Sequence, residues 1–145
     1  MILNIRHTGL VVHDLQRSIK FYEELGLKIW RHEIESGVYI DKVVGISGVK
    51  IEWAKMRCPD GSLLELLQYH SHPDDKPPLD TPANQLGCSH IAFTVDDIEN
   101  LCVQIIRLGG SLVNQPSLSP NGLVKVAYCH DPDGVLIEVV EEIKN

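Results

Sequence analysis

The sequence has few cysteines, no cluster of basic residues and no long apolar run. Its 145 residues include 13 Lys and Arg against 20 Asp and Glu, which gives a net charge of −7. An acidic chain without a basic patch is a poor ligand for nucleic acids or anionic membranes. No segment approaches the ~20 consecutive apolar residues of a membrane-spanning helix, and the first residues do not resemble a secretory signal. We therefore expect a cytoplasmic protein with no nucleic-acid or membrane partner.

The four cysteines are scattered along the chain and form no CxxC pair. Such spacing indicates neither a zinc knuckle nor a disulfide framework, so reduced thiols are expected. What the chain does have is an ordinary globular composition, with 43% hydrophobic and 23% charged residues. This composition and length are typical of one domain, which we expect to span residues 1–145.

One sequence unit occurs twice. HTGLVVHDL, which begins at His7, aligns with HIAFTVDDI, which begins 83 residues later at His90. Both copies continue through an aspartate suited to capping a helix, Asp14 or Asp97, into an amphipathic segment. The turn sequences PDGSLLE and PDGVLIE also match, now 73 residues apart, so the first copy has ten more residues, which we place within 36–48. Each copy is predicted to form a strand, a helix and about three further strands.

The two copies divide the domain into modules. Module one is expected at residues 1–69 and module two at residues 88–145, with a linker at 70–87 that contains four prolines. Proline-rich segments act as semi-rigid joints, and a loop of this length is unusual inside a compact module. His70 and His72 at the start of the linker form an HxH pair that could bind a metal, although a solvated loop is the commoner setting for such residues.

Two glutamates interrupt apolar runs at equivalent positions of the modules. Glu65 lies in SLLELLQY and Glu138 in GVLIEVVEE, and both runs are predicted to be strands covered on both faces. An unpaired carboxylate in such a strand costs several kcal/mol. The repeat also pairs His7 with His90 in the opening strands, and a pseudo-twofold arrangement would bring all four side chains toward one axis.

Two imidazoles and two carboxylates suit a divalent first-row metal, because the two negative charges neutralise the ion. A single histidine in an apolar strand is more often a hydrogen-bonded core residue, but here the set is duplicated. We therefore predict a metal site with two positions left for substrate oxygens. Its predicted ligands are His7, Glu65, His90 and Glu138.

These motifs resemble those of the vicinal oxygen chelate superfamily, which includes glyoxalase I. The resemblance is carried by HTGLVVHDLQRSIKFYEELGLKI and by SHIAFTVDDI followed by DPDGVLIEVVEE, and it extends from His7 through Glu142. It implies an α+β fold in which two tandem βαβββ modules form a half-open eight-stranded barrel, commonly in a homodimer. It also implies one divalent metal per site, Zn, Ni, Co or Mn, held by the same four ligands.

The activity that the resemblance implies is that of a divalent-metal-dependent lyase or isomerase, like glyoxalase I or an epimerase. Such an enzyme stabilises an enediolate or enolate of a small carbonyl or thioester substrate. In glyoxalase I a glutamate of the closing strand moves the proton, which implies a catalytic role for Glu138, with Glu65 as its counterpart.

Three positions bear on the choice of subfamily. Four residues after the first ligand, where glyoxalase I has an arginine that grips glutathione, this chain has Val11. Methylmalonyl-CoA epimerase typically has a glutamine at the position of Glu65. Glu52, in the strand candidate VKIEWAKM, is interpreted either as an extra base or as an exposed edge charge.

Two other functions stay open. A metal-dependent dioxygenase or thiol transferase would use two histidines and one glutamate of the set. A non-catalytic small-molecule binding protein, like those of bleomycin resistance, would use the cleft without a metal. The segments 36–48 and 117–122 are expected to line the entrance to the site, and a small molecule is the expected partner besides a second copy of the chain.

Overall fold

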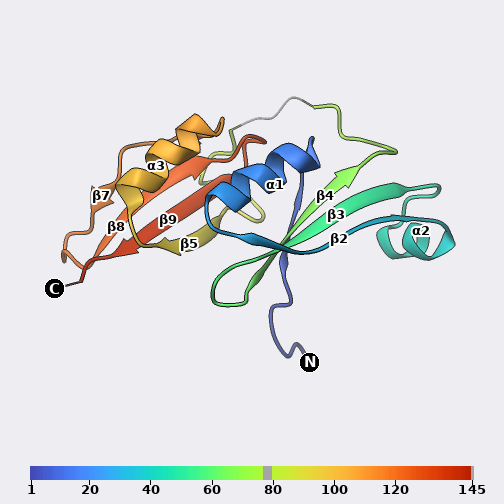
Figure 1. Cartoon of the computed structure of the whole chain (residues 1–145), viewed down its shortest axis with the longest axis horizontal. Coiled ribbons are helices and arrows are strands. Elements are labelled where there is room, and N and C mark those ends of the chain that lie inside the picture. The colour runs from blue at the N-terminus through green and yellow to red at the C-terminus, as the bar shows by residue number, and fades with distance from the viewer. Residues whose placement is uncertain (77–79, 145) are drawn as a thin grey trace. The chain divides into compact units, whose positions relative to one another are not determined.

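The computed structural model describes residues 1–76 and 80–144 and contains two compact units, residues 1–76 and 77–145 (Figure 1). Each unit is described by itself. Residues 77–79 of the expected linker and residue 145 of module two lie outside the described residues. Among the helices of the described part, none is long and apolar enough to cross a membrane.

The first unit contains a mixed four-stranded sheet with the strand order β1-β4-β3-β2. β1 is parallel to β4, and the other neighbours are antiparallel. In chain order its elements are β1 (Thr8–Val11), α1 (Leu15–Glu24), β2 (Lys28–Ser36), α2 (Val38–Val44), β3 (Lys50–Arg57) and β4 (Leu63–Tyr69).

The second unit repeats this topology. Its sheet has the order β5-β9-β8-β6, with the short strand β7 also paired to β8, and β5 is parallel to β9. In chain order its elements are β5 (Ile91–Val95), α3 (Ile98–Arg107), β6 (Ser111–Leu112), β7 (Ser117–Leu118), β8 (Val124–His130) and β9 (Leu136–Glu142). The α+β class and the duplicated order of strand, helix and further strands are thus confirmed.

Both long helices begin where the sequence predicts. The side chain of Asp14 accepts a hydrogen bond from the Arg17 amide, and that of Asp97 accepts one from the Asn100 amide, as expected of N-caps. Each helix is also tied to the closing strand of its own sheet, because the first helical amide donates to Gln68 in one unit and to Glu141 in the other.

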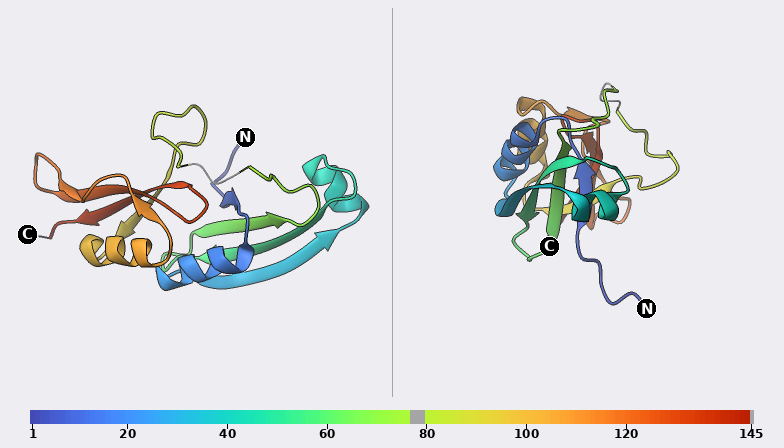
Figure 2. Two further views of the ribbon diagram at one scale, coloured as in Figure 1. Left: turned by 90° about the horizontal axis from the view of Figure 1, so that it is seen from above. Right: turned by 90° about the vertical axis from the view of Figure 1, so that its right-hand side faces the viewer.

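The sheet of the first unit has one face toward α1 and another toward α2. Figure 2 shows the two helices on opposite sides of its strands. The α1 side is the main core, where Tyr22, Met56 and Leu66 are at most 1% exposed. On the other side Ile40 of α2 packs with Ile51 and Trp53. Helix α2 lies within 36–48, the segment predicted to hold the extra residues.

The burial of β4 corrects one expectation from the sequence. Leu64 and Leu66 are buried, whereas Leu63, Glu65 and Leu67 are only half-buried. The strand is therefore not covered equally on both faces. Its alternation is hidden in the sequence because leucines occupy both faces, and Glu65 lies on the less buried one.

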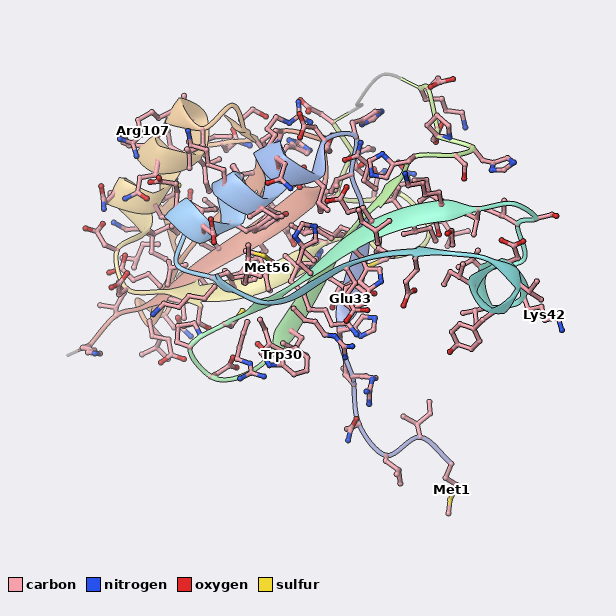
Figure 3. All side chains as sticks on the ribbon, turned by 45° about the vertical axis from the view of Figure 1, so that its right-hand side comes forward. Met1, Trp30, Glu33, Lys42, Met56 and Arg107 are labelled. Atoms are coloured by element: carbon pink, nitrogen blue, oxygen red, sulfur yellow. The ribbon has the colours of Figure 1, made fainter. Side chains whose placement is uncertain are left out.

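Side chains of β2 and β3 also alternate between the two faces, except where the pairing of β2 shifts between Ile29 and Arg31. Met56 lies on the side of α1, and Figure 3 shows Trp30 and Glu33 on the other side of the ribbon. The register pairs Glu33 with Trp53 and Lys55 with Glu65. Because directly paired residues of antiparallel strands share a face, these four side chains lie on the face of Glu65.

Candidate functional site

The first predicted pair of ligands is in contact within the first unit. His7 directly precedes β1, and its Nε2 lies 2.9 Å from Oε2 of Glu65 in the adjacent strand β4. The two side chains are 27% and 14% exposed. The Nδ1 atom of His7 is buried and has no hydrogen-bond partner among the described residues. One ring nitrogen of His7 therefore stays unsatisfied in either neutral tautomer.

The second predicted pair repeats this geometry in the second unit. His90 directly precedes β5, and its Nε2 lies 2.9 Å from Oε2 of Glu138 in β9. The side chains are 30% and 22% exposed. Two histidines and two glutamates thus occupy equivalent positions and form equivalent contacts, one pair in each unit.

The surroundings of His90 define its tautomer. The Ser89 hydroxyl donates its hydrogen to the carbonyl of Ala83, at 2.9 Å, so its oxygen is left to accept. Nδ1 of His90 lies 3.1 Å from that oxygen and therefore carries the donated proton. In the neutral ring the lone pair is then on Nε2 and faces the Glu138 carboxylate. A metal cation held by the pair would accept this lone pair.

Tyr128 is a third residue at the second pair, and sequence reasoning missed it. It is the cross-strand partner of Glu138, and its ring meets the His90 ring edge-on at a centroid distance of 5.2 Å. Burial raises the pKa of the Tyr128 phenol, and the charge and hydrogen bond of Glu138 raise it further. Tyr128 therefore stays protonated and donates to Glu138. Only the β8–β9 register could have revealed this neighbour.

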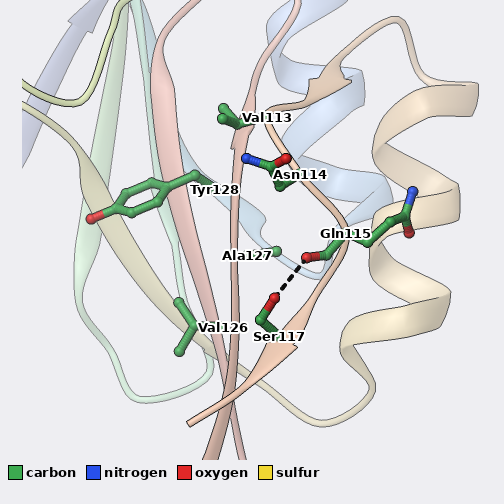
Figure 4. Close-up of a pocket in the computed structure, with 7 residues that line it drawn as sticks. All are labelled: Val113, Asn114, Gln115, Ser117, Val126, Ala127 and Tyr128. Carbon is green, nitrogen blue, oxygen red and sulfur yellow. Dashed lines mark hydrogen bonds between the residues drawn. The ribbon is translucent and has the colours of Figure 1, made fainter.

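Tyr128 also lines a pocket of the second unit (Figure 4). The tyrosine ring extends from β8 away from the segment of Gln115 and Ser117, whose hydroxyl donates to the Gln115 carbonyl at 3.3 Å. Of the segment 117–122, expected at the site entrance, Ser117 lines this pocket. The lining residues are Val113, Asn114, Gln115, Ser117, Val126, Ala127 and Tyr128.

Glu52 differs from its predicted setting. It was expected as an exposed edge charge or an extra base, but β3 is an inner strand and the Glu52 side chain is only 16% exposed. Its two oxygens contact Nε2 of His32 and Nε2 of His70, each at 2.7 Å. The alternation of β3 directs Glu52 to the face opposite Lys55 and Glu65. Glu52 is thus not beside the first predicted pair.

The pH dependence of stability tests this contact. The hydrogen bond from His70 holds the pKa of the Glu52 carboxyl below its usual value of 4.5; that of His32 acts likewise and burial opposes it. The ionised carboxylate therefore stabilises the fold above pH 4.5, and this contribution is lost as the pH falls through the folded-state pKa. We expect Glu52→Gln to lower the free energy of unfolding by about 1–2 kcal/mol near pH 6.

Urea unfolding of Glu52→Gln and the parent chain between about pH 6 and pH 3 measures this difference. The difference in free energy of unfolding between the two chains should become smaller as the pH falls. The exposed Glu23 supplies the matched variant Glu23→Gln, which should lie within about 0.5 kcal/mol of the parent throughout. A Glu52→Gln difference that stays constant down to pH 3 would contradict the assignment.

The cysteines offer no nucleophile in the core. All four thiols are free, and Cys102 and Cys129 are buried. Burial raises the pKa of Cys129 to about 12 and also raises that of Cys102. A thiol with a raised pKa is protonated at neutral pH and unreactive, so these two residues serve as small core side chains.

No group of three or more His, Cys, Asp or Glu side chains in residues 1–76 and 80–144 has an arrangement that could hold a metal ion. Each His–Glu pair is therefore described by itself. The donor types fit a divalent metal, because each pair offers an imidazole nitrogen and a carboxylate oxygen. In each pair the Nε2 atom of the histidine faces the carboxylate, so Nε2 is the nitrogen that a cation held by the pair would contact.

The fold and the paired contacts define a class of α+β protein in which a βαβββ unit with one His–Glu contact occurs twice. Comparison with known proteins identifies the class further. The model of the Glyoxalase/Bleomycin resistance protein/Dioxygenase superfamily matches residues 4–139. The chain belongs to this superfamily.

Two curated relatives are similar over nearly their whole length. Lactoylglutathione lyase from Escherichia coli O157:H7 is 34% identical over 142 residues, which cover 97% of this chain and 93% of the relative. A probable lactoylglutathione lyase from Synechocystis sp. is 31% identical over 137 residues, covering 93% and 92%. At this level of identity the relatives support the superfamily and suggest an enzyme.

Solved structures agree with the fold. A glyoxalase family protein from Bacillus cereus superposes with a TM-score of 0.91 at 28% identity, covering 99% of this chain and 97% of the other. Glyoxalase I from Zea mays superposes with a TM-score of 0.66 at 23% identity, and the match covers 97% of this chain and 45% of the maize chain. The maize likeness concerns the fold alone.

Proposed function

We propose that the chain is a divalent-metal-dependent lyase or isomerase of the glyoxalase type. The observation that carries the proposal is the duplicated contact, His7 with Glu65 and His90 with Glu138, at 2.9 Å in each unit. The proposed metal ligands are these four residues, and the metal is Zn, Ni, Co or Mn. When bound, such an ion acts as a Lewis acid that stabilises negative charge developing on substrate oxygens.

The residues of the second pair suit proton transfer next to a carbonyl group. Glu138 is the proposed base, and its half-buried carboxylate lies 2.9 Å from Nε2 of His90. Tyr128 donates to Glu138 and packs against His90, so it positions both side chains. Ser89 orients the ring of His90 by accepting from Nδ1. Glu65 is the counterpart of Glu138 in the first unit.

The substrate of the proposed reaction is a small carbonyl or thioester compound. The relatives named lactoylglutathione lyase support a glutathione conjugate of this kind. Val11, which is 57% exposed, cannot make the arginine contact to glutathione that glyoxalase I makes at this position. Acyl thioesters therefore belong in the same screen.

Elemental analysis of protein purified without added metal tests the proposal, followed by assays of metal-loaded protein. The substrates to compare are hemithioacetals, acyl-CoA epimers and catechols. We expect a stoichiometric divalent metal and turnover of a hemithioacetal or thioester. Absence of any stoichiometric metal would contradict the proposal, aerobic iron-dependent turnover of a catechol would favour a dioxygenase, and an unchanged ligand retained by metal-free protein would favour a binding protein.

A cytoplasmic homodimer is part of the proposal. Light scattering on the purified chain measures its oligomeric state. Mixing His7→Ala chains with Glu138→Ala chains then distinguishes two ways of building the site: activity returns if each site is shared between two chains, and it stays absent if each site lies within one chain.

A further inference from the structure

Three cations that contact an aromatic ring or a carboxylate gather with two tryptophans on the face of the first sheet that carries Glu65, next to a fourth cation, Lys28 of β2. Their positions follow from the register, in which Arg31 of β2 pairs with Lys55 of β3, and Lys55 pairs with Glu65 of β4. Arg31, Lys55 and Glu65 thus form one row across three neighbouring strands. We call this set the cationic face; its members besides Glu65 are Trp30, Arg31, Trp53, Lys55 and Arg57.

A bulge in β2 shapes this face. The pairing of β2 with β3 shifts between Ile29 and Arg31, which leaves Trp30 as the extra residue. A bulge redirects side chains locally, and here Trp30 meets Arg57, whose guanidinium carbon lies 4.6 Å from the centre of the indole ring. The bulge therefore adds the Trp30 ring to the cationic face, where it meets the Arg57 guanidinium supplied by β3.

The ammonium group of Lys55 lies between a carboxylate and an aromatic ring and is partly buried. Its Nζ lies 3.5 Å from Oε1 of Glu65 and 4.9 Å from the centre of the Trp53 ring, and the side chain is only 18% exposed. Trp53 is 8% exposed and is held by Ile40 of α2 and by Ile51. An ammonium group in such a setting depends on its anionic neighbour, since both solvent and rotamer freedom are restricted.

The charges of the face do not balance once Glu65 binds a metal. Arg31 pairs with Glu33, and Lys55 pairs with Glu65. Arg57 contacts the Trp30 ring and no carboxylate among the described residues. If the charge of Glu65 is used by a divalent cation, as under the proposed function, Lys55 loses its counter-ion and a half-buried positive charge stands beside a positive ion. An anionic group of the substrate would restore the balance.

We propose that the cationic face binds an anionic oxygen group of the substrate, a carboxylate or a phosphate, through Lys55 and its neighbouring guanidinium groups, with Trp53 against the adjoining carbon atoms. The proposal rests on the proposed function and names the substrate class of the same site: carbonyl compounds that carry an anionic group. It also accounts for a cationic contact in a chain that has Val11 where an arginine would bind glutathione.

The two tryptophans make this proposal measurable, because the chain contains no others. Protein loaded with Zn²⁺, which has a filled d shell, is titrated at fixed ionic strength with succinate, with inorganic phosphate and with uncharged succinamide. We expect saturable changes of tryptophan emission with one or both anions and none with succinamide. The variant Trp53→Phe should lose most of the change, and the tighter-binding anion identifies the group as carboxylate or phosphate.

Lys55→Met is the decisive variant, and Lys50→Met is its match, since Lys50 is an exposed lysine of the same strand. We expect Lys55→Met to weaken anion binding at least tenfold while its zinc content stays at the parental level, and Lys50→Met to bind like the parent. Equal affinity in Lys55→Met would overturn the proposal, because the anion would then be held by the metal alone. Absence of any saturable change in the parent would overturn it too.

The two proposals fail separately. A chain that binds stoichiometric zinc but no anion supports the metal site and overturns the cationic face. A chain that binds no zinc contradicts the proposed function. Lys55-dependent binding of succinate or phosphate by that chain would support the anion site and contradict the step in which a metal on Glu65 frees Lys55.

Discussion

Replacing Glu138 with glutamine is expected to lower turnover by about 10³-fold, because a positioned general base commonly contributes 10²–10⁴-fold and an amide cannot accept the proton. Glutamine keeps the size of the side chain and an oxygen that can still accept from Tyr128 and contact a cation. The fold and part of the metal affinity should therefore survive. The measurement is kcat on whichever carbonyl substrate turns over, with metal content determined on the same sample.

Glu142→Gln is the matched control for this variant. Glu142 lies in the same strand, four residues further on, and is exposed. It should turn over at the parental rate. A Glu138→Gln enzyme within about threefold of the parent, with its metal bound, would exclude Glu138 as the base, and a variant that has lost all metal would report on ligation and not on proton transfer.

Local sequence signals allowed both modules to be predicted. A capping aspartate before each long helix and a Pro-Asp-Gly turn before each closing strand are encoded within a few residues, and Gly61 and Gly134 both adopt the positive φ that such turns require. The repeat added further information, because a segment whose secondary structure is ambiguous in one copy can be assigned from the equivalent segment of the other copy. His7, Glu65, His90 and Glu138 were predicted as a set in this way, and the structure brings them into contact as two His–Glu pairs.

What the sequence did not reveal depends on strand pairing. Tyr128 becomes a neighbour of Glu138 only through the β8–β9 register, and Lys55 becomes a neighbour of Glu65 only through β3 and β4. Glu52 was misread because nothing local shows that β2 covers the outer side of β3. Cross-strand neighbours are set by contacts between distant residues, which a single sequence records weakly.

Each sheet carries one His–Glu pair, and the cationic face belongs to the first sheet alone. The residues directly before β1 and β5 and those in the middle of β4 and β9 supply the proposed nitrogen and oxygen donors. The neighbouring strand β3 supplies charge of the opposite sign. The extra segment of the first unit forms α2, which packs on Trp53 and holds it beside Lys55. The two copies therefore differ at the segment that forms α2, beside the proposed substrate-binding residues. The two His–Glu pairs remain equivalent.

Removing one histidine from either pair should abolish metal binding by the whole chain. We expect the parent to bind one divalent metal per chain, and His7→Ala and His90→Ala each to weaken binding at least about 100-fold, more than loss of an outer-shell partner does. Combining the two substitutions should add little to either one, because residues that hold the same ion act as a unit. Equilibrium dialysis with Zn²⁺ followed by elemental analysis gives both stoichiometry and affinity.

The alternative is that each His–Glu pair binds a metal ion of its own, and the same measurement distinguishes it. If each His–Glu pair bound its own ion, the parent would hold two metals per chain and each single variant would retain one, which would contradict a common site. His13→Ala controls for the loss of a histidine, since His13 is exposed and its ring contacts the carbonyl of Lys76. Metal should raise the Tm of the parent and of His13→Ala and leave that of His7→Ala and His90→Ala unchanged, because an ion stabilises only the folded chain that binds it.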